Sequence, residues 1–338
     1  MDKIQHNISL KNYNTFGIDV KARSFIEINT VAALQELTTS EEMSNHFLLG
    51  GGSNMLLTKD IDALVVHLNI KGKKIIDEDD NHVWIKANAG ENWHDFVLWC
   101  IDQDFGGLEN MSLIPGNVGT APIQNIGAYG VELKDSFIEC EVVEIESGLV
   151  KLFDHASCQF DYRNSIFKSE LKGKIVITSV TFKLTKKNHT LNTSYGAIES
   201  ELSNMGIDSP TIKDISDVVI TIRQSKLPDP NTLGNSGSFF KNPVISKEAF
   251  DLFIAKHPEA PNYKVSNTEV KIPAGWLIEQ VGFKGKRFGD AGVHNKQALV
   301  LVNHGHAKGE EIWQLAMKIK AAVKEQFDID ITPEVNIY

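Results

Sequence analysis

The stretch "IPGNVGTAPIQNIGAYG", residues 114–130, decides how the rest of the chain is interpreted, because it combines glycine with polar amides. Four of its residues are glycine, and Pro, Ile, Gln and Asn stand between them. A flexible linker would consist mainly of Gly and Ser. Glycine and alanine at Gly116, Gly119, Gly127 and Ala128 instead keep side chains out of the backbone's path. The pattern predicts a loop whose backbone comes very close to a ligand.

A second glycine-rich loop, "LLGGGSNMLL", lies at residues 48–57 between apolar residues that predict a strand on each side. Three consecutive glycines can turn successive amides the same way and form a nest that binds an anion. Ser53 and Asn54 add side-chain donors. In the first stretch, Gln124 and Asn125 carry amides that can pair with the edge of a heterocycle, and Ile123 and Ile126 can pack on a flat face.

Two such loops, far apart in the sequence, suit an elongated ligand with a pyrophosphate in its middle and an aromatic ring at one end. FAD fits this description. Neither loop has the Rossmann G-x-G-x-x-G pattern, and the chain contains no G-x-x-x-x-G-K-[ST]. The alternative is that both loops are tight turns in which glycine only satisfies backbone geometry. The polar amides that accompany the glycines favour the ligand.

Composition excludes several classes of protein. The 338 residues are 42% hydrophobic and 23% charged, and the formal net charge is -10, which argues against a nucleic-acid partner. The three cysteines are widely spaced, so a disulfide framework and a zinc cluster are not expected. The N-terminus lacks an apolar core of signal-peptide length, and no apolar run could span a bilayer. We expect a soluble, cytoplasmic protein that does not insert into a membrane.

Hydrophobic periodicity predicts a mixed α+β protein of two or three domains. Strands are expected at 24–28, 63–68, 73–90 (two strands around an acidic turn), 138–153, 174–185 and 297–303. Helices are expected near 31–39, at 91–103, at 273–282 with Pro at its start, and at 310–327. A segment rich in Pro, Gly and Asn, residues 223–243, is a plausible domain boundary.

With these segments in view, the chain resembles the UDP-N-acetylenolpyruvoylglucosamine reductase family. The matching residues run nearly end to end. They are "NTFGI", "LGGGSN", "IPGNVGTAPIQNIGAYGVE", "CQFDYRNSIFK", "SKLPDP", "GNSGSFFKNP" and "PEV". The "TSYG" segment resembles the longer subtype of the family, in which a Tyr loop folds over the substrate. One departure is "GNVGTAP", where many relatives have another glycine in place of Asn or Thr.

The resemblance implies a fold and a reaction. The fold is a two-lobed FAD-binding fold of the vanillyl-alcohol-oxidase/PCMH type with a third α+β domain for the substrate. We expect lobe 1 at 1–70, lobe 2 at 71–225 and the substrate domain at 226–328, with the tail 329–338 returning to the active site. NADPH is the implied hydride donor, a UDP-sugar enolpyruvyl ether is the implied substrate, and no obligate protein partner is expected.

The resemblance also implies site residues. Tightly bound FAD would contact Gly50, Gly51, Gly52, Ser53, Asn54, Pro115, Gly116, Val118, Gly119, Thr120, Ile123, Gln124, Asn125, Ile126, Gly127 and Ala128. Substrate would contact Tyr195, Arg223, Lys226, Asn242, Tyr263, Lys284 and Gln297, since cations and phenols suit a diphosphate and a uridine.

Three residues match the family's catalytic positions. The guanidinium of Arg163 offers a positive charge for a carboxylate, and Ser238 is the implied proton donor. Glu334, in the C-terminal tail, is the third implied catalytic residue. On the residues alone each has an ordinary interpretation: a salt bridge, a turn serine and a solvated acidic tail. The alternating Ile331, Val335 and Ile337 nevertheless predict that the tail docks as a strand.

Parts of the sequence are also compatible with other functions. "GNSGS" weakly resembles the nucleophile turn of a serine hydrolase, but no G-x-S-x-G elbow is present. A non-catalytic nucleotide-binding module and an FAD-dependent oxidoreductase of another specificity on the same fold are further alternatives. "HGH" at 304–306 is expected to be a loop, not a metal site, because no carboxylate or Cys completes a tetrahedral set.

Overall fold

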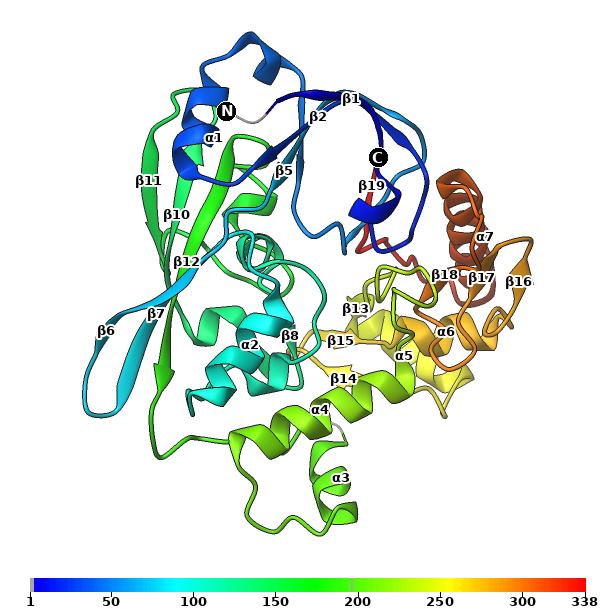
Figure 1. Ribbon diagram of the computed structural model, residues 1–338. Helices are drawn as coiled ribbons and strands as arrows, with labels where there is room; N and C mark the ends of the chain where they lie inside the picture. Colours follow the sequence, from blue (N-terminus) through cyan, green and yellow to red (C-terminus); the bar gives the residue numbers. More distant parts are fainter. Residues whose placement is uncertain (1–2, 196) are drawn as a thin grey trace. The chain divides into compact units, whose positions relative to one another are not determined.

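A computed structural model describes residues 3–195 and 197–338 (Figure 1). The chain divides into two compact units. Unit 1 consists of residues 1–8, 22–51 and 61–225, and unit 2 of residues 9–21, 52–60 and 226–338. Two short segments from the first fifth of the sequence therefore belong with its last third.

The first sheet of unit 1 is built around two parallel strands of apolar residues. Its order is β1-β2-β5-β3, and both β2 and β3 run parallel to β5. Helix α1 connects β2 to β3, and Thr30 caps its N-terminus by accepting a hydrogen bond from the N–H of Ala33. The bounds are β1 Gln5–Ser9, β2 Lys21–Ile28, α1 Val31–Thr38, β3 His46–Leu49 and β5 Ile61–Leu68.

The second sheet of unit 1 is antiparallel, in the order β11-β10-β12-β7-β6, and its β6–β7 hairpin projects from the sheet (Figure 1). The central strand β12 is buried along nearly its whole length. Strands β6 and β11 are the two edges. The bounds are β6 Lys73–Glu78, β7 His82–Asn88, β10 Phe137–Glu144, β11 Val150–Asp154 and β12 Ile175–Thr185.

Helix α2, Trp93–Asp102, closes the core of the second sheet with aromatic side chains. The Phe182 ring lies 5.2 Å from the ring of Phe96 and 5.9 Å from that of Trp93, between centroids. These side chains are fully buried. The two sheets share a smaller core, in which Leu34 and Leu37 of α1 pack with residues of β2, β5, β10 and β12. Unit 1 ends with α3 Ile198–Asn204 and α4 Ile212–Lys226.

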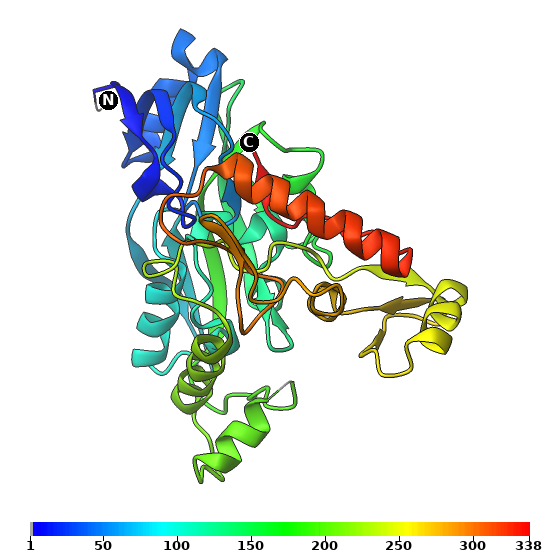
Figure 2. The same cartoon turned by 90° about the vertical axis from the view of Figure 1, so that its right-hand side faces the viewer.

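Unit 2 holds short strands and the longest helix of the described chain, α7, which Figure 2 shows along its length. Its apolar side chains Ile312, Leu315, Ala316, Ile319 and Val323 are buried, as their spacing predicts. The other bounds are β4 Met55–Leu56, β13 Val244–Ser246, α5 Lys247–Lys256, β14 Tyr263–Lys264, β15 Glu269–Lys271, α6 Ala274–Gln280, β16 Arg287–Phe288, β17 Ala291–Val293, β18 Leu301–Asn303, α7 Gly309–Phe327 and β19 Asn336–Ile337.

The expected mixture of strands and helices is confirmed, with three differences at boundaries. Helix α4 extends to Lys226, so the irregular connection begins at residue 227 instead of 223. The strand expected at 297–303 covers only Leu301–Asn303, because residues 297–300 form a turn in which the N–H of Val300 donates to the carbonyl of Gln297. Pro273 is the N-cap of α6, one residue before the helix begins. In the described ranges, no helix is long and apolar enough to cross a membrane.

We predict that Phe182→Ala destabilises the protein by about 3–5 kcal/mol, because it leaves a cavity among fully buried rings. The free energy of unfolding in denaturant measures this. Leu152→Ala is the matched control on edge strand β11, since Leu152 is 59% exposed and its loss should change stability by less than about 0.5 kcal/mol. Equal losses in the two variants would contradict the placement of the core.

Candidate functional site

The two glycine-rich loops lie against each other in unit 1. A Cβ on Gly51 would stand 2.9 Å from Cα of Gly116 and 2.8 Å from Oδ1 of Asn117. A Cβ on Gly50 would stand 2.5 Å from Cγ2 of Thr120. Real Cβ atoms do not approach so closely, so glycine is required at both positions for the loops to touch.

Backbone N–H groups are left open where the loops meet. Gly51 and Gly116 donate no hydrogen bond to any acceptor within the described ranges. Gly116 also has a φ of +115°, which glycine adopts readily. Open amides on two adjoining loops form a cradle for an anion, so the residues present fit the pyrophosphate of FAD.

Residues 118–126 are held in place by two 3₁₀ turns and by hydrogen bonds to neighbouring parts of unit 1. Two short 3₁₀ helices, Val118–Thr120 and Pro122–Gln124, are followed by Asn125 in the left-handed conformation. The Asn125 Nδ2 donates to Glu132 Oε2 at 3.0 Å and to the carbonyl of Asp161 at 3.2 Å. Its Oδ1 accepts the N–H of Lys134. The buried Asn125 amide is therefore used to hold the turn, not offered to a heterocycle.

The glycines of this stretch also make room for the protein itself. A Cβ on Gly127 would meet the carbonyl oxygen of Val131 at 2.6 Å, across the small hairpin formed by β8 (Gly127–Ala128) and β9 (Val131–Glu132). A Cβ on Gly119 would meet Ala89. Ile123 and Ile126 pack partly against the core of the second sheet. Within this one loop, some glycines allow the chain to pack tightly against itself, and others leave backbone amides open to a ligand.

Arg163 is held against the same turn. Its Nη2 donates to the carbonyl of Gly127 and its Nη1 to that of Asn125, and Nη1 lies 3.8 Å from Glu132 Oε1. The Arg163 backbone has a φ of +53°, an uncommon conformation for a residue with a long side chain. The sequence thus places a fixed guanidinium beside the end of the glycine-rich loop.

Tyr195 and Arg223, both expected to contact substrate, both lie near Tyr129. The rings of Tyr129 and Tyr195 are 6.4 Å apart and nearly perpendicular. Burial raises the pKa of the Tyr129 hydroxyl, and the nearby Arg223 partly offsets this. Burial likewise lowers the pKa of Arg223. Sequence reasoning missed Tyr129, although it stands in "GAYG" with a φ of +50°.

In unit 2, residues 52–57 of the glycine-rich loop 48–57 are enclosed by other motifs of the sequence. The carbonyl of Gly52 accepts the N–H of Thr15 in "NTFGI", and the hydroxyl of Ser236 in "GNSGS" donates to the carbonyl of Met55. A Cβ on Gly52 would stand 2.0 Å from the carbonyl oxygen of Tyr13. Three segments that are far apart in sequence thus pack around one turn.

The C-terminal tail docks in unit 2, as its alternating apolar residues predict. Strand β19 pairs in parallel with β4, and the carbonyl of Tyr338 accepts the N–H of Thr58 at 2.7 Å. The N–H of Glu334 donates to the carbonyl of Phe239, the residue after Ser238. Glu334 and Ser238 therefore lie on neighbouring segments. The regular strand is shorter than expected, because residues 332–334 pair with the segment 239–241 and only Asn336–Ile337 pairs with β4.

The remaining residues expected to contact substrate lie in unit 2. Some of them are hydrogen-bonded within the protein and others are exposed. The Oδ1 of Asn242 accepts the N–H of Ala274 and so caps α6. The Oε1 of Gln297 accepts the N–H of Leu299, and Lys284 Nζ pairs with Glu279 at 3.0 Å. Tyr263 is exposed on β14, and Lys226 is exposed at the end of α4.

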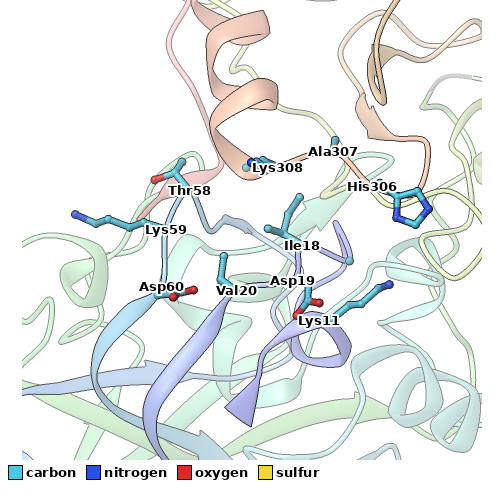
Figure 3. A pocket seen from close by; sticks show the side chains of 13 residues that line it. Lys11, Ile18, Asp19, Val20, Thr58, Lys59, Asp60, His306, Ala307 and Lys308 are labelled. Atoms are coloured by element: carbon cyan, nitrogen blue, oxygen red, sulfur yellow. The ribbon is translucent and has the colours of Figure 1, made fainter. Parts of the chain in front are cut away.

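A cavity of about 330 Å³ in unit 2 contains none of the expected site residues (Figure 3). Its lining mixes charges, with Lys11, Lys59 and Lys308 beside Asp19 and Asp60. Figure 3 shows the Lys59 side chain directed away from the labelled group. Over the two described ranges, no three His, Cys, Asp or Glu side chains are grouped as metal ligands.

Comparison with known proteins shows to which class of protein the chain belongs. The model of an FAD binding domain matches residues 27–152, the region that contains both glycine-rich loops. The fold as a whole is similar to the crystal structure of UDP-N-acetylenolpyruvylglucosamine reductase (MurB) from Thermus caldophilus, with a TM-score of 0.70, 22% identity and coverage of 99% of each chain. The chain is an FAD-binding oxidoreductase, and the expected α+β fold with a two-lobed FAD-binding part is confirmed.

The particular family follows from full-length relatives. The model of the UDP-N-acetylenolpyruvoylglucosamine reductase C-terminal domain matches residues 229–338. The chain is 61% identical over 335 residues to the UDP-N-acetylenolpyruvoylglucosamine reductase of Flavobacterium johnsoniae, covering 99% of each. It is 44% identical to that of Bacteroides fragilis, covering 98% of this chain and 99% of the relative. The chain belongs to the UDP-N-acetylenolpyruvoylglucosamine reductase family.

We predict that Gly51→Ala lowers flavin affinity at least tenfold, because its methyl group would push the two glycine-rich loops apart and displace their open amides. Titration of the flavin-free protein with FAD, followed by flavin fluorescence, measures this. Gly206→Ala is the control: its Cβ meets nothing within 4 Å, although its φ of +70° would cost about 1–2 kcal/mol of stability. Normal flavin affinity in Gly51→Ala would contradict the loop contact as the basis of the cradle.

Proposed function

We propose that this protein uses NADPH to reduce the enolpyruvyl group of UDP-N-acetyl-3-O-(1-carboxyvinyl)-glucosamine and so forms UDP-N-acetylmuramate for peptidoglycan synthesis. Family membership supports this activity. The structural observation that carries it is the contact between the two glycine-rich loops, with open amides at Gly51 and Gly116. FAD, when held by these loops, would supply hydride transfer between NADPH and the substrate's double bond.

The residues proposed to hold FAD are those of the two loops. The amides of Gly51 and Gly116 would take the pyrophosphate. Thr120, on the 3₁₀ helix that follows, lies with its methyl group beside Gly50, and its hydroxyl donates to the carbonyl of Asn117. The Asn125 side chain would act indirectly, because its amide is used to hold the turn. Its proposed contact with the cofactor is therefore through the backbone.

Addition of hydride to the methylene carbon leaves an enolate conjugated to the substrate carboxylate, so the chain must stabilise negative charge. We propose Arg163 for this role. Its guanidinium is charged at any physiological pH and is held by the carbonyls of Asn125 and Gly127, which fixes its direction before substrate binds.

The alpha carbon must then receive a proton, and we propose Ser238 as its donor with Glu334 as its assistant. A serine hydroxyl is a weak acid and needs a polarising neighbour. The backbone bond from Glu334 to Phe239 keeps the carboxyl-bearing segment beside the serine-bearing one. For the UDP moiety we propose Tyr195, Arg223, Lys226, Asn242, Tyr263, Lys284 and Gln297.

The cellular setting and the domain division are also proposals. Three buried, unpaired cysteines suit a reducing cytoplasm. We retain lobes at 1–70 and 71–225 and a substrate domain at 226–328, with the tail returning to the site. We further propose that the protein needs no obligate protein partner.

A coupled assay tests the proposed function. NADPH consumption should require the enolpyruvyl sugar nucleotide, and the purified protein should be yellow. A colourless protein that hydrolyses esters would indicate a serine hydrolase. Flavin without any NADPH consumption would indicate a binding module, and turnover with O₂ but not with the sugar nucleotide would indicate an oxidase.

We predict that Ser238→Ala lowers the rate of substrate reduction by roughly 10²–10⁴-fold, because the proton donor is lost. NADPH should still bleach the flavin absorbance at a nearly normal rate in a stopped-flow experiment. Ser236→Ala is the matched control, because the Ser236 hydroxyl donates to the carbonyl of Met55. This variant should lose about 1 kcal/mol of stability, and its rate of substrate reduction should stay within a few-fold of that of the unmodified protein. Equal loss of bleaching and substrate reduction in Ser238→Ala would assign Ser238 a structural role.

We predict that Glu334→Gln slows substrate reduction by several orders of magnitude while FAD and substrate bind normally. Glutamine keeps the shape and much of the hydrogen-bonding capacity but has no exchangeable acid proton. Steady-state kcat and KM, with flavin content, measure this, and Glu325→Gln on the exposed side of α7 is the control. A loss below about tenfold, or 1.4 kcal/mol of barrier, would make Glu334 only a neighbour of the chemistry.

A further inference from the structure

Residues 111–116, which lead into the glycine-rich stretch 114–130, are held between two helices of unit 1. From α2, the indole Nε1 of Trp93 donates to the carbonyl of Met111 at 3.0 Å, and the Trp93 N–H donates to the carbonyl of Gly116. From α4, the hydroxyl of Ser216 lies 2.7 Å from that of Ser112. The path of the chain into the proposed FAD cradle is thus set by these helices.

Leu113, at the centre of this segment, has an unfavourable backbone conformation. Its φ is +59°, in the left-handed region that a bulky residue rarely adopts. Such a conformation costs about 1–3 kcal/mol and persists only where neighbours fix it. Here both of its backbone polar groups are fixed. The N–H donates to Nδ1 of His94 at 3.0 Å, and the carbonyl accepts Nε of Arg223 at 3.2 Å.

This geometry specifies the protonation state of His94. Because Nδ1 accepts a hydrogen bond, it carries no proton, and the imidazole is the neutral Nε2–H tautomer. Burial lowers the pKa of His94, and the Arg223 charge lowers it further, while Asp95 on the same helix opposes this. A proton on Nδ1 would place a donor against the N–H of Leu113, itself a donor, and would add a positive charge near the half-buried guanidinium of Arg223.

We infer that His94 is a positioning residue for the cofactor loop: its neutral Nδ1, together with Arg223, holds Leu113 in the left-handed conformation and thereby directs Pro115 and Gly116 into the FAD cradle. This inference rests on the proposed function, since it takes the loop to be the FAD site. His94 touches neither cofactor nor substrate in this assignment and acts through the Leu113 backbone.

A direction of pH dependence follows. In the folded protein the pKa of His94 is lowered below its ordinary value of 6.5, so acid favours states in which the Leu113 contact is broken. The clamp is therefore complete above about pH 6.5 and is progressively lost as the pH falls below it. FAD affinity should fall in the same window, because the cradle amides depend on the clamp.

The test compares FAD affinity at pH 7.5 and pH 5.0, by flavin fluorescence, in the full-length protein and two variants. In His94→Asn, Oδ1 replaces Nδ1 as an acceptor two bonds from Cβ but cannot titrate. In His94→Leu the acceptor is absent. The unmodified protein should lose at least tenfold in affinity on acidification, and His94→Asn less than threefold. His94→Leu should be weakened at least tenfold already at pH 7.5.

A second measurement is independent of the cofactor. Hydrogen exchange at the Leu113 amide should be fast in His94→Leu and protected in His94→Asn at pH 7.5. The exposed His155 of unit 1 provides the control, and His155→Asn should keep the acid response of the unmodified protein.

The outcomes separate the inference from the proposed function. An acid-induced loss of affinity that is as large in His94→Asn as in the unmodified protein would overturn the role of His94, and so would an unmodified protein without any acid response. Normal affinity and Leu113 protection in His94→Leu would also overturn it. A protein that binds no FAD at pH 7.5 would instead contradict the proposed function.

Discussion

The approach of one bare backbone to another, Gly51 to Gly116, is the constraint on which the proposed site depends. Neither loop would be remarkable by itself, since a glycine turn is a common way to reverse a chain. Their contact removes side chains from both partners at once and leaves the N–H groups of Gly51 and Gly116 without an acceptor among the described residues. The interior of unit 1 holds these groups in place through the 3₁₀ turns at 118–124 and the buried Asn125 amide. A rigid, pre-organised anion cradle costs little further ordering when its ligand arrives.

In unit 2, segments from near both ends of the chain pack together around residues 52–58. Residues near the N-terminus, the "GNSGS" turn and the C-terminal tail all pack on the short segment 52–58. A carboxyl near the end of a chain would ordinarily be mobile and solvated. Here the Glu334 N–H and the Tyr338 carbonyl are both hydrogen-bonded within the unit, so the tail has a defined place from which a carboxyl can act.

Much of the fold was accessible from the sequence, because periodicity reports the faces of helices and strands directly. The apolar stripe of α7, the docked tail and the hairpin around the acidic turn are examples. Contacts between distant segments were not accessible: nothing in the sequence states that Gly50 meets Thr120, or that the Asn125 amide turns inward to Glu132 and Asp161. His94 and Tyr129 were missed for the same reason. Their environments depend on Leu113 in its left-handed conformation and on the half-buried Arg223, which only the folded chain brings near them.

The interleaving of the two units has a consequence for the order in which the molecule can assemble. Asn303 bonds Phe16 across 287 positions of sequence, and Thr58 bonds Tyr338 across 280. Closing a flexible loop of that size costs about 5 kcal/mol of chain entropy before any contact forms. While the chain is being synthesised, segments 9–21 and 52–60 remain without their partners until the last third has been made. Unit 1 can form around its own sheets before the last third is made, whereas unit 2 depends on long-range contacts, which predict slow formation.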